Sequence, residues 1–171
     1  MLEEVRIQGL GVIDDAVVEL SPGLTVVTGE TGAGKTMVVT GLGLLFGGRA
    51  DPQRVRPGAD RAVVEGRLTV PLDGRVASRV FDAGGDIEDN VLLMARTVSA
   101  EGRSRASMGG RSAPVSLLAY LAEDLVAVHG QSDQQRLLRT DRQRSSLDRF
   151  AGAELSRSMK QYSVAFRRYR E

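Results

Sequence analysis

Gly29-Glu30-Thr31-Gly32-Ala33-Gly34-Lys35-Thr36 is the stretch of sequence that decides the fold. It matches the whole pattern G-x-x-x-x-G-K-[ST], in which glycines let backbone N–H groups curl around phosphates without interference from a Cβ. In such a loop Lys35 reaches the β- and γ-phosphates, and the Thr36 hydroxyl ligates Mg²⁺. The motif predicts that Gly29, Glu30, Thr31, Gly32, Ala33, Gly34, Lys35 and Thr36 bind the phosphates of a nucleoside triphosphate.

The residues on either side of this loop fit the same interpretation. Leu24-Thr25-Val26-Val27-Thr28 is a short apolar run rich in β-branched residues, which predicts a buried strand. Residues 35–46 read as a helix that Gly47-Gly48 ends. A helix that begins at the loop adds the positive end of its dipole to the phosphate site. The order strand, loop, helix predicts an α/β P-loop fold.

Further strands and one further helix are predicted along the first 139 residues. Alternation of apolar and polar residues, with turn signals between the runs, indicates strands around Val5 and Ile7 and at residues 16–20, 62–70, 91–98, 104–108 and 125–128. Residues 115–123 have helical spacing after Pro114. Several neighbouring strands are joined by short turns, so we expect a mixed sheet that is partly antiparallel.

The chain changes character at Thr140. From there an apolar seam recurs every three or four residues to the end of the sequence, which predicts one helix of about 30 residues. We therefore expect two parts: residues 1–139 as the nucleotide-binding lobe and residues 140–171 as the start of a coiled coil. The seam consists of Leu147, Ala151, Leu155, Met159, Tyr162, Phe166 and Tyr169. A terminal helix packed on its own domain is the alternative.

Composition excludes several classes of protein. The 171 residues are 42% hydrophobic and contain no cysteine and one histidine, His129, so neither a disulfide scaffold nor a Cys- or His-based metal site is expected. No apolar run reaches the 18 or so residues of a membrane span, and the acidic N-terminus does not resemble a signal peptide. These features predict a cytoplasmic protein that does not contact a membrane.

Charge is distributed unevenly. Residues 1–135 carry a net charge of −5 and residues 136–171 a net charge of +6. The basic end could contact DNA phosphates, which would make binding steeply salt-dependent. No aromatic stacking platform accompanies it, and the sequence does not support sequence-specific recognition. A solvated helix face is the alternative explanation for this charge.

No apolar strand after residue 36 ends in a convincing second acidic motif, which P-loop ATPases need to hold Mg²⁺ and orient water. The sequence therefore contains the phosphate-binding part of a P-loop site without the second acidic motif.

Several segments together resemble one family. Residues 1–11, the phosphate loop and the following helix are similar to the N-terminal head segment of SMC-like ABC ATPases. Residues 45–51, 55–58, 62–66 and 128–131 follow in the order found in a bacterial branch that acts at DNA double-strand breaks. The resemblance covers roughly residues 1–145. It implies an ABC/SMC-type head lobe that binds ATP and Mg²⁺ in DNA repair and recombination, associated with the nucleoid.

The resemblance also implies roles for single residues. Gln131 would be the Q-loop glutamine, a catalytic residue that touches Mg²⁺ and the attacking water. Lys35 of the phosphate loop would be the other catalytic residue. Arg54 and Arg56 lie where this family places basic residues near the nucleotide, and Arg56 is the one that we expect to bind it. Residues 132–135 depart from the usual His- and Glu-containing run of the family.

The signature motif, second acidic motif and switch histidine of ABC heads do not occur in this sequence. The resemblance implies that the C-terminal half of the same head supplies them, and that two heads sandwich ATP so that head engagement is ATP-gated. This chain alone should then bind nucleotide and turn it over negligibly. Two alternatives stay open: a self-contained small P-loop NTPase or kinase, and an interaction module whose working part is the terminal helix.

Overall fold

The computed structural model describes residues 1–30, 34–126, 143–144, 147–148 and 150–170. The chain divides into two units, Met1–Ala127 and Val128–Glu171, which are considered separately. The predicted Gln131 site, the His129 position and the Thr140 boundary all lie outside the described residues.

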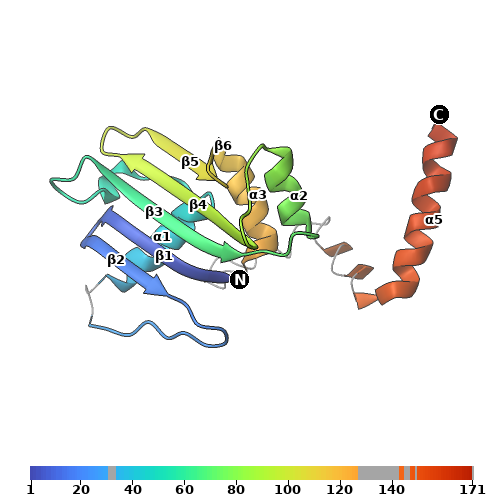
Figure 1. Cartoon of the computed structure of the whole chain (residues 1–171), viewed down its shortest axis with the longest axis horizontal. Coiled ribbons are helices and arrows are strands. Elements are labelled where there is room, and N and C mark those ends of the chain that lie inside the picture. Colours follow the sequence, from blue (N-terminus) through green and yellow to red (C-terminus); the bar gives the residue numbers. More distant parts are fainter. Residues whose placement is uncertain (31–33, 127–142, 145–146, 149, 171) are drawn as a thin grey trace. The chain divides into compact units, whose positions relative to one another are not determined.

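The first unit is built on a six-stranded sheet with the order β2-β1-β3-β4-β5-β6. Every neighbouring pair is antiparallel, which confirms the antiparallel part of the predicted sheet (Figure 1). Short connections between successive strands allow this arrangement. The strands are β1 (Leu2–Leu10), β2 (Ile13–Glu19), β3 (Arg61–Thr69), β4 (Val91–Ser99), β5 (Ser104–Met108) and β6 (Arg111–Ala113).

One face of this sheet carries the hydrophobic core. Along β1, β3 and β4 alternate residues are buried, as expected when one face of an antiparallel sheet is covered and the other is open. The largest fully buried side chains of the core come from both strands and helices, and include Ile7, Leu10, Leu45, Leu68, Leu92, Met94, Met108, Leu118 and Leu121.

Three helices cover the core face or its end. Helix α1 (Lys35–Leu45) contacts β1, β3 and β4 and lies behind the sheet in Figure 1. Helix α3 (Val115–Leu125) contacts β5, and α2 (Arg75–Asp82) contacts α3. The sequence predicted α1 and α3 but not α2, whose apolar residues Val76, Ala77 and Val80 form a narrow buried stripe within only two turns.

The prediction of a buried strand at Leu24–Thr28 is wrong for this chain. The segment has no regular secondary structure, and Leu24, Val26 and Val27 are 88%, 67% and 48% exposed. In Figure 1 it leaves the edge strand β2 and returns towards α1 without joining the sheet. A strand needs a partner for its backbone groups, and none of the described strands is available beside this run.

The predicted strand at residues 125–128 is also not found where the structure describes it. Leu125 is the last residue of α3, and its cap Val126 has extended backbone geometry. The helix extends two residues beyond the predicted end because Leu121 and Leu125 continue its apolar side towards the core. Residues 127 and 128 lie outside the described part.

The second unit contains α5 (Gly152–Arg170), which confirms a C-terminal helix. The predicted single helix is divided, however, by a turn at Ala151 and by Gly152, whose φ is +73°. Residues 143–144, 147–148 and 150 are helical before that turn. A left-handed residue cannot continue an α-helix, so the apolar seam is interrupted at this glycine. Among the described helices, none is long and apolar enough to cross a membrane.

Candidate nucleotide-binding site

The phosphate loop leads directly into α1. Gly34 precedes the helix with φ +101°, a left-handed conformation that glycine adopts without strain, and its carbonyl accepts hydrogen bonds from the N–H groups of Met37 at 2.8 Å and Val38 at 3.0 Å. No side chain caps this helix and no acidic residue lies in its first turn. No acidic side chain within the first turn of α1 therefore offsets the positive end of the helix dipole.

Lys35 closes the loop on itself. Its amine donates a hydrogen bond to the Glu30 carbonyl at 2.7 Å and another to the Gly29 carbonyl. Both acceptors lie at the start of the loop, so the one side chain ties the two ends of the described loop together. Thr31, Gly32 and Ala33 lie between these ends and outside the described residues.

A pocket of about 700 Å³ opens beside the start of α1. Its walls come from three segments: the turn between β1 and β2, the first residues of α1, and the short 3₁₀ helix at Pro52–Arg54 with the loop that follows it. The lining residues are Gly11, Val12, Gly34, Lys35, Thr36, Met37, Gln53, Arg54 and Pro57. A pocket of this size, continuous with Lys35 and Thr36, has room for a nucleoside beside the phosphates.

Backbone hydrogen bonds hold two of these walls together. The Gly11 N–H donates to the Arg54 carbonyl at 2.7 Å, and the Arg56 N–H donates to the Gly9 carbonyl at 2.8 Å. Gly11 has a φ of +56°, and a Cβ there would lie 2.5 Å from the Met37 sulfur. A larger residue would therefore be strained by this φ and would displace the Met37 side chain where the β1–β2 turn passes α1.

The two arginines of this region have different surroundings. The Arg54 Nη1 donates to the Thr40 hydroxyl at 2.8 Å, and Arg54 lines the pocket. The Arg56 Nη1 donates to the Val12 carbonyl at 2.8 Å, and its Nε lies 3.7 Å from an Asp14 carboxylate oxygen. Arg56 is not among the lining residues, so it holds the β1–β2 turn and contacts the pocket through Val12.

Five residues that line the pocket were not predicted from the sequence: Gly11, Val12, Met37, Gln53 and Pro57. Met37 directly follows the phosphate loop in α1, whereas the other four precede or follow the loop by about 20 residues and reach it only through strand register. The one available signal was Gly9-Leu10-Gly11, two glycines within a run that otherwise alternates like a strand, which marks a close backbone approach.

The donors at this site fit a nucleoside triphosphate. The Lys35 amine, the Thr36 hydroxyl and the uncapped start of α1 are the groups that a phosphate needs. Within the described ranges, no cluster of three or more His, Cys, Asp or Glu residues could hold a metal ion. Mg²⁺ is commonly bound through few protein ligands together with phosphate oxygens and water, so the absence of such a cluster is compatible with a Mg²⁺ held mainly by phosphates.

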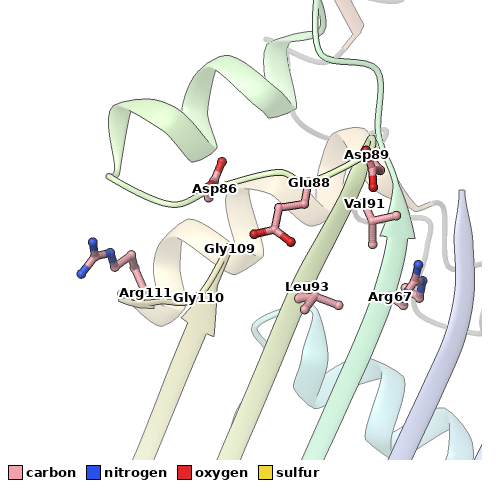
Figure 2. Close-up of a pocket in the computed structure, with 9 residues that line it drawn as sticks. All are labelled: Arg67, Asp86, Glu88, Asp89, Val91, Leu93, Gly109, Gly110 and Arg111. Carbon is pink, nitrogen blue, oxygen red and sulfur yellow. The ribbon is translucent and has the colours of Figure 1, made fainter.

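A second hollow, of about 420 Å³, lies on the open face of the sheet (Figure 2). Figure 2 shows the carboxyl groups of Asp86, Glu88 and Asp89 along one edge, with Arg67 and Arg111 at its two sides. Three carboxylates would repel a phosphate group, so this hollow does not compete with the loop as a nucleotide site.

Comparison with known proteins agrees with these features. A family model described as an AAA domain matches residues 4–91, just over half of the chain, and this match implies nucleotide binding. A DNA repair protein RecN from Streptomyces coelicolor is 64% identical over 97% of this chain. The chain spans only 29% of the length of that relative.

Solved structures of SMC heads share the fold. The Smc head domain of Pyrococcus furiosus, with an extended coiled coil and bound to a domain of ScpA, has a TM-score of 0.64 and 19% identity, over 96% of this chain and 45% of that one. A structure from work on ATP-driven dimerization and DNA-stimulated activation of SMC ATPases has a TM-score of 0.61 and 19% identity, over 86% of this chain and 97% of that one. From the phosphate loop, the fold and these similarities, we conclude that the chain belongs to the AAA-domain family and corresponds to part of a RecN protein.

Proposed function

We propose that this chain is the ATP-binding half of an SMC-like ATPase head that acts in DNA double-strand-break repair. The observation that carries the proposal is the junction of the phosphate loop, the uncapped start of α1 and the 700 Å³ pocket beside them. The triphosphate would lie along the loop from Gly29 to Thr36, and the nucleoside would lie between Val12 and Pro57. The relationship to RecN proteins and SMC heads supports ATP as the nucleotide.

Each residue then has a distinct role. Lys35 would exchange its two loop carbonyls for phosphate oxygens, and its positive charge would stabilise the charge that develops during phosphoryl transfer. The Thr36 hydroxyl would hold Mg²⁺, which neutralises phosphate charge when it is bound. Gln131 would orient the attacking water, and Arg56 would act near the nucleotide by fixing Val12.

The exposed run Leu24–Thr28 supports the interpretation that this chain is only part of a head. Its β-branched residues suit a strand, yet they lie in solvent and their backbone lacks a partner strand among the described elements. An exposed run of this kind is ready to pair with another segment. We propose that the C-terminal half of the same head supplies that segment, together with the motifs needed for hydrolysis.

The remaining partners follow from the same proposal. A second head would close over ATP, and DNA would be bound without sequence preference in the bacterial nucleoid, within the cytoplasm. Residues 1–139 would form the lobe and residues 140–171 would begin the coiled coil. In α5 the rings of Tyr162 and Phe166 stack 5.7 Å apart, and both side chains are exposed, which suits a helix that needs a partner helix.

The first experiment measures ATP binding and steady-state hydrolysis by this chain, beside Lys35→Ala. We expect the chain to bind Mg-ATP with negligible turnover, and Lys35→Ala to weaken binding by at least about tenfold because a charged partner of the phosphates is lost. Lys160→Ala is the matched control, since Lys160 is the only other lysine and lies exposed in α5.

Two results would contradict the proposal. Equal loss of binding in both lysine variants would show that the phosphate loop is not the site. Turnover by this chain that depends on Lys35 would show a complete active site, and a small self-contained P-loop NTPase would then be the better description.

A further inference from the structure

The face of the sheet opposite α1 is open and divided by charge. Its outward positions alternate with the core positions along β3 and β4, so that Arg61, Glu65 and Arg67 are exposed between buried neighbours. At one end of this face lie the three carboxylates of Figure 2, Asp86, Glu88 and Asp89. The opposite end, near the turn between β4 and β5, carries a basic groove.

This basic groove, called here the arginine groove, has a volume of about 380 Å³ and crosses three neighbouring strands. Strand register places Arg61 of β3 opposite Ser99 of β4, and Thr97 of β4 opposite Arg105 of β5. Its lining residues are Arg61, Thr97, Ser99, Glu101, Arg103 and Arg105. It shares no lining residue with the nucleotide pocket.

The arginines of the groove differ from the others on the same face. Arg6 forms an ion pair with Asp15 at 2.7 Å, and Arg67 forms one with Glu3 at 3.4 Å. In the part of the chain that the structure describes, no ion pair within 4.0 Å involves Arg61, Arg103 or Arg105. Three like charges around one groove repel each other until an anion enters it.

The only carboxylate that lines the groove offsets part of this charge. A hydrogen bond from the Ser99 hydroxyl, a backbone hydrogen bond and the nearby charge of Arg103 lower the pKa of Glu101. Glu101 is therefore ionised at neutral pH, and the six lining residues together carry a net charge of +2. The groove is thus electropositive, and the hydroxyl-bearing residues Thr97 and Ser99 also line it.

We propose that the arginine groove binds the phosphodiester backbone of double-stranded DNA, an inference that rests on the proposed role in DNA repair. Guanidinium groups match phosphate oxygens in geometry as well as in charge. No aromatic side chain lines the groove, so it offers nothing on which unpaired bases could stack. Contacts to phosphates alone suit a duplex whose bases stay stacked, and they carry no sequence preference.

The proposed DNA contact lies in the arginine groove and not at the basic residues of the C-terminal helix. In α5 the basic side chains follow one another along a helix and are exposed: Arg157, Lys160, Arg167, Arg168 and Arg170. They do not line any of the five hollows described for the chain. The groove instead brings together Arg61 of β3, Arg105 of β5 and Arg103 of the turn between β4 and β5 around one hollow.

The test compares two variants of equal charge loss in the complete protein. One carries Arg61→Gln, Arg103→Gln and Arg105→Gln; the other carries Arg157→Gln, Arg167→Gln and Arg168→Gln in α5. Binding of a labelled duplex of random sequence is measured by fluorescence anisotropy between about 50 and 200 mM salt, because each phosphate contact contributes about 0.9 to the salt slope. Binding of ATP is measured on the same samples.

We expect the groove variant to bind DNA at least about tenfold more weakly at low salt, with a slope reduced by about 2–3, and the α5 variant to stay within about twofold of the parent. Loss confined to the α5 variant, or the same affinity in all three proteins, would overturn the inference. The inference would also be overturned if poly-glutamate displaced the labelled DNA as effectively as unlabelled duplex does, because the occupant would then be an acidic protein segment.

Two further measurements distinguish a failure of the inference from a folding defect and from a failure of the proposed function. If the triple variant does not fold, Arg105→Gln alone should still reduce the slope by about 0.9, and an unchanged slope would count against the groove. Failure of the Lys35-dependent ATP binding in the parent protein would overturn the proposed function, whereas the DNA measurement decides the groove in either case.

Discussion

At the scale of single residues, Arg96 departs most from the expected pattern. It lies on β4 on the core side, opposite Val64 and Ala106, and it is only 3% exposed. Its Nε and Nη1 have no hydrogen-bond partner among the residues that the structure describes, and burial lowers the pKa of the guanidinium. A buried charge without an acceptor costs more than an apolar side chain of similar volume.

We therefore expect Arg96→Met to raise the free energy of unfolding of this chain by about 1–3 kcal/mol. Thermal and urea unfolding measure the change. Arg67→Met on the exposed face is the control and should change stability by less than about 0.5 kcal/mol. A loss of stability in Arg96→Met would mean that the guanidinium has an acceptor outside the described residues.

At the scale of elements, the end of α1 explains how the helix is held against its neighbour α3. Gly47 follows the helix with φ +84°, and a Cβ there would lie 2.6 Å from the backbone nitrogen of Ala119. Gly47 meets two requirements at once: the helix ends there, and α3 approaches its backbone closely. Gly43 lies within the same helix, and a Cβ there would meet nothing within 4 Å.

These two glycines make a matched pair of substitutions. Gly47→Ala should destabilise the chain by about 2–3 kcal/mol, because both the backbone conformation and the contact with α3 are lost. Gly43→Ala should stabilise it by about 0.5–1 kcal/mol through helix propensity. Denaturant unfolding of the two variants beside the parent chain gives both signs, and equal effects would contradict this description of the helix end.

Some of the helices and strands could be predicted from the sequence, and others could not. The phosphate loop and α1 follow from local chemistry, and so do β3, β4 and β5, whose period-two patterns lie between clear turn signals. Helix α2 was missed because its buried stripe is short, and the strand at Leu24–Thr28 was predicted from composition without knowledge of a partner. Val12 and Pro57 were missed as pocket residues because strand register, which a pattern does not contain, brings them to the loop.

At the scale of the whole molecule, the exposed run Leu24–Thr28 is the part most affected by the rest of the head. In this chain alone its backbone amides should exchange hydrogen nearly as fast as in a free peptide. In the complete protein we expect protection of at least about 100-fold, because pairing with the C-terminal half would bury them. Hydrogen exchange followed by mass spectrometry compares the two proteins directly.

A variant separates this explanation from a general change in stability. Val26→Lys with Val27→Lys should leave the melting temperature of this chain nearly unchanged, since both side chains are already about half or more exposed. The same change should lower the melting temperature of the complete protein and prevent protection of the run. Equal exchange of the run in the two parent proteins would contradict its pairing in the head.

The exposed run also has a consequence for the order of synthesis. If the complete protein is as long as the Streptomyces relative, of which this chain spans 29%, roughly 400 residues must still be translated after Glu171. At bacterial elongation rates this takes about 20–80 s, during which the lobe has emerged from the ribosome and its intended partner has not. Throughout that interval Leu24, Val26 and Val27 would be a binding site for a chaperone that recognises nascent chains, and an overproduced lobe would keep that site for its whole lifetime.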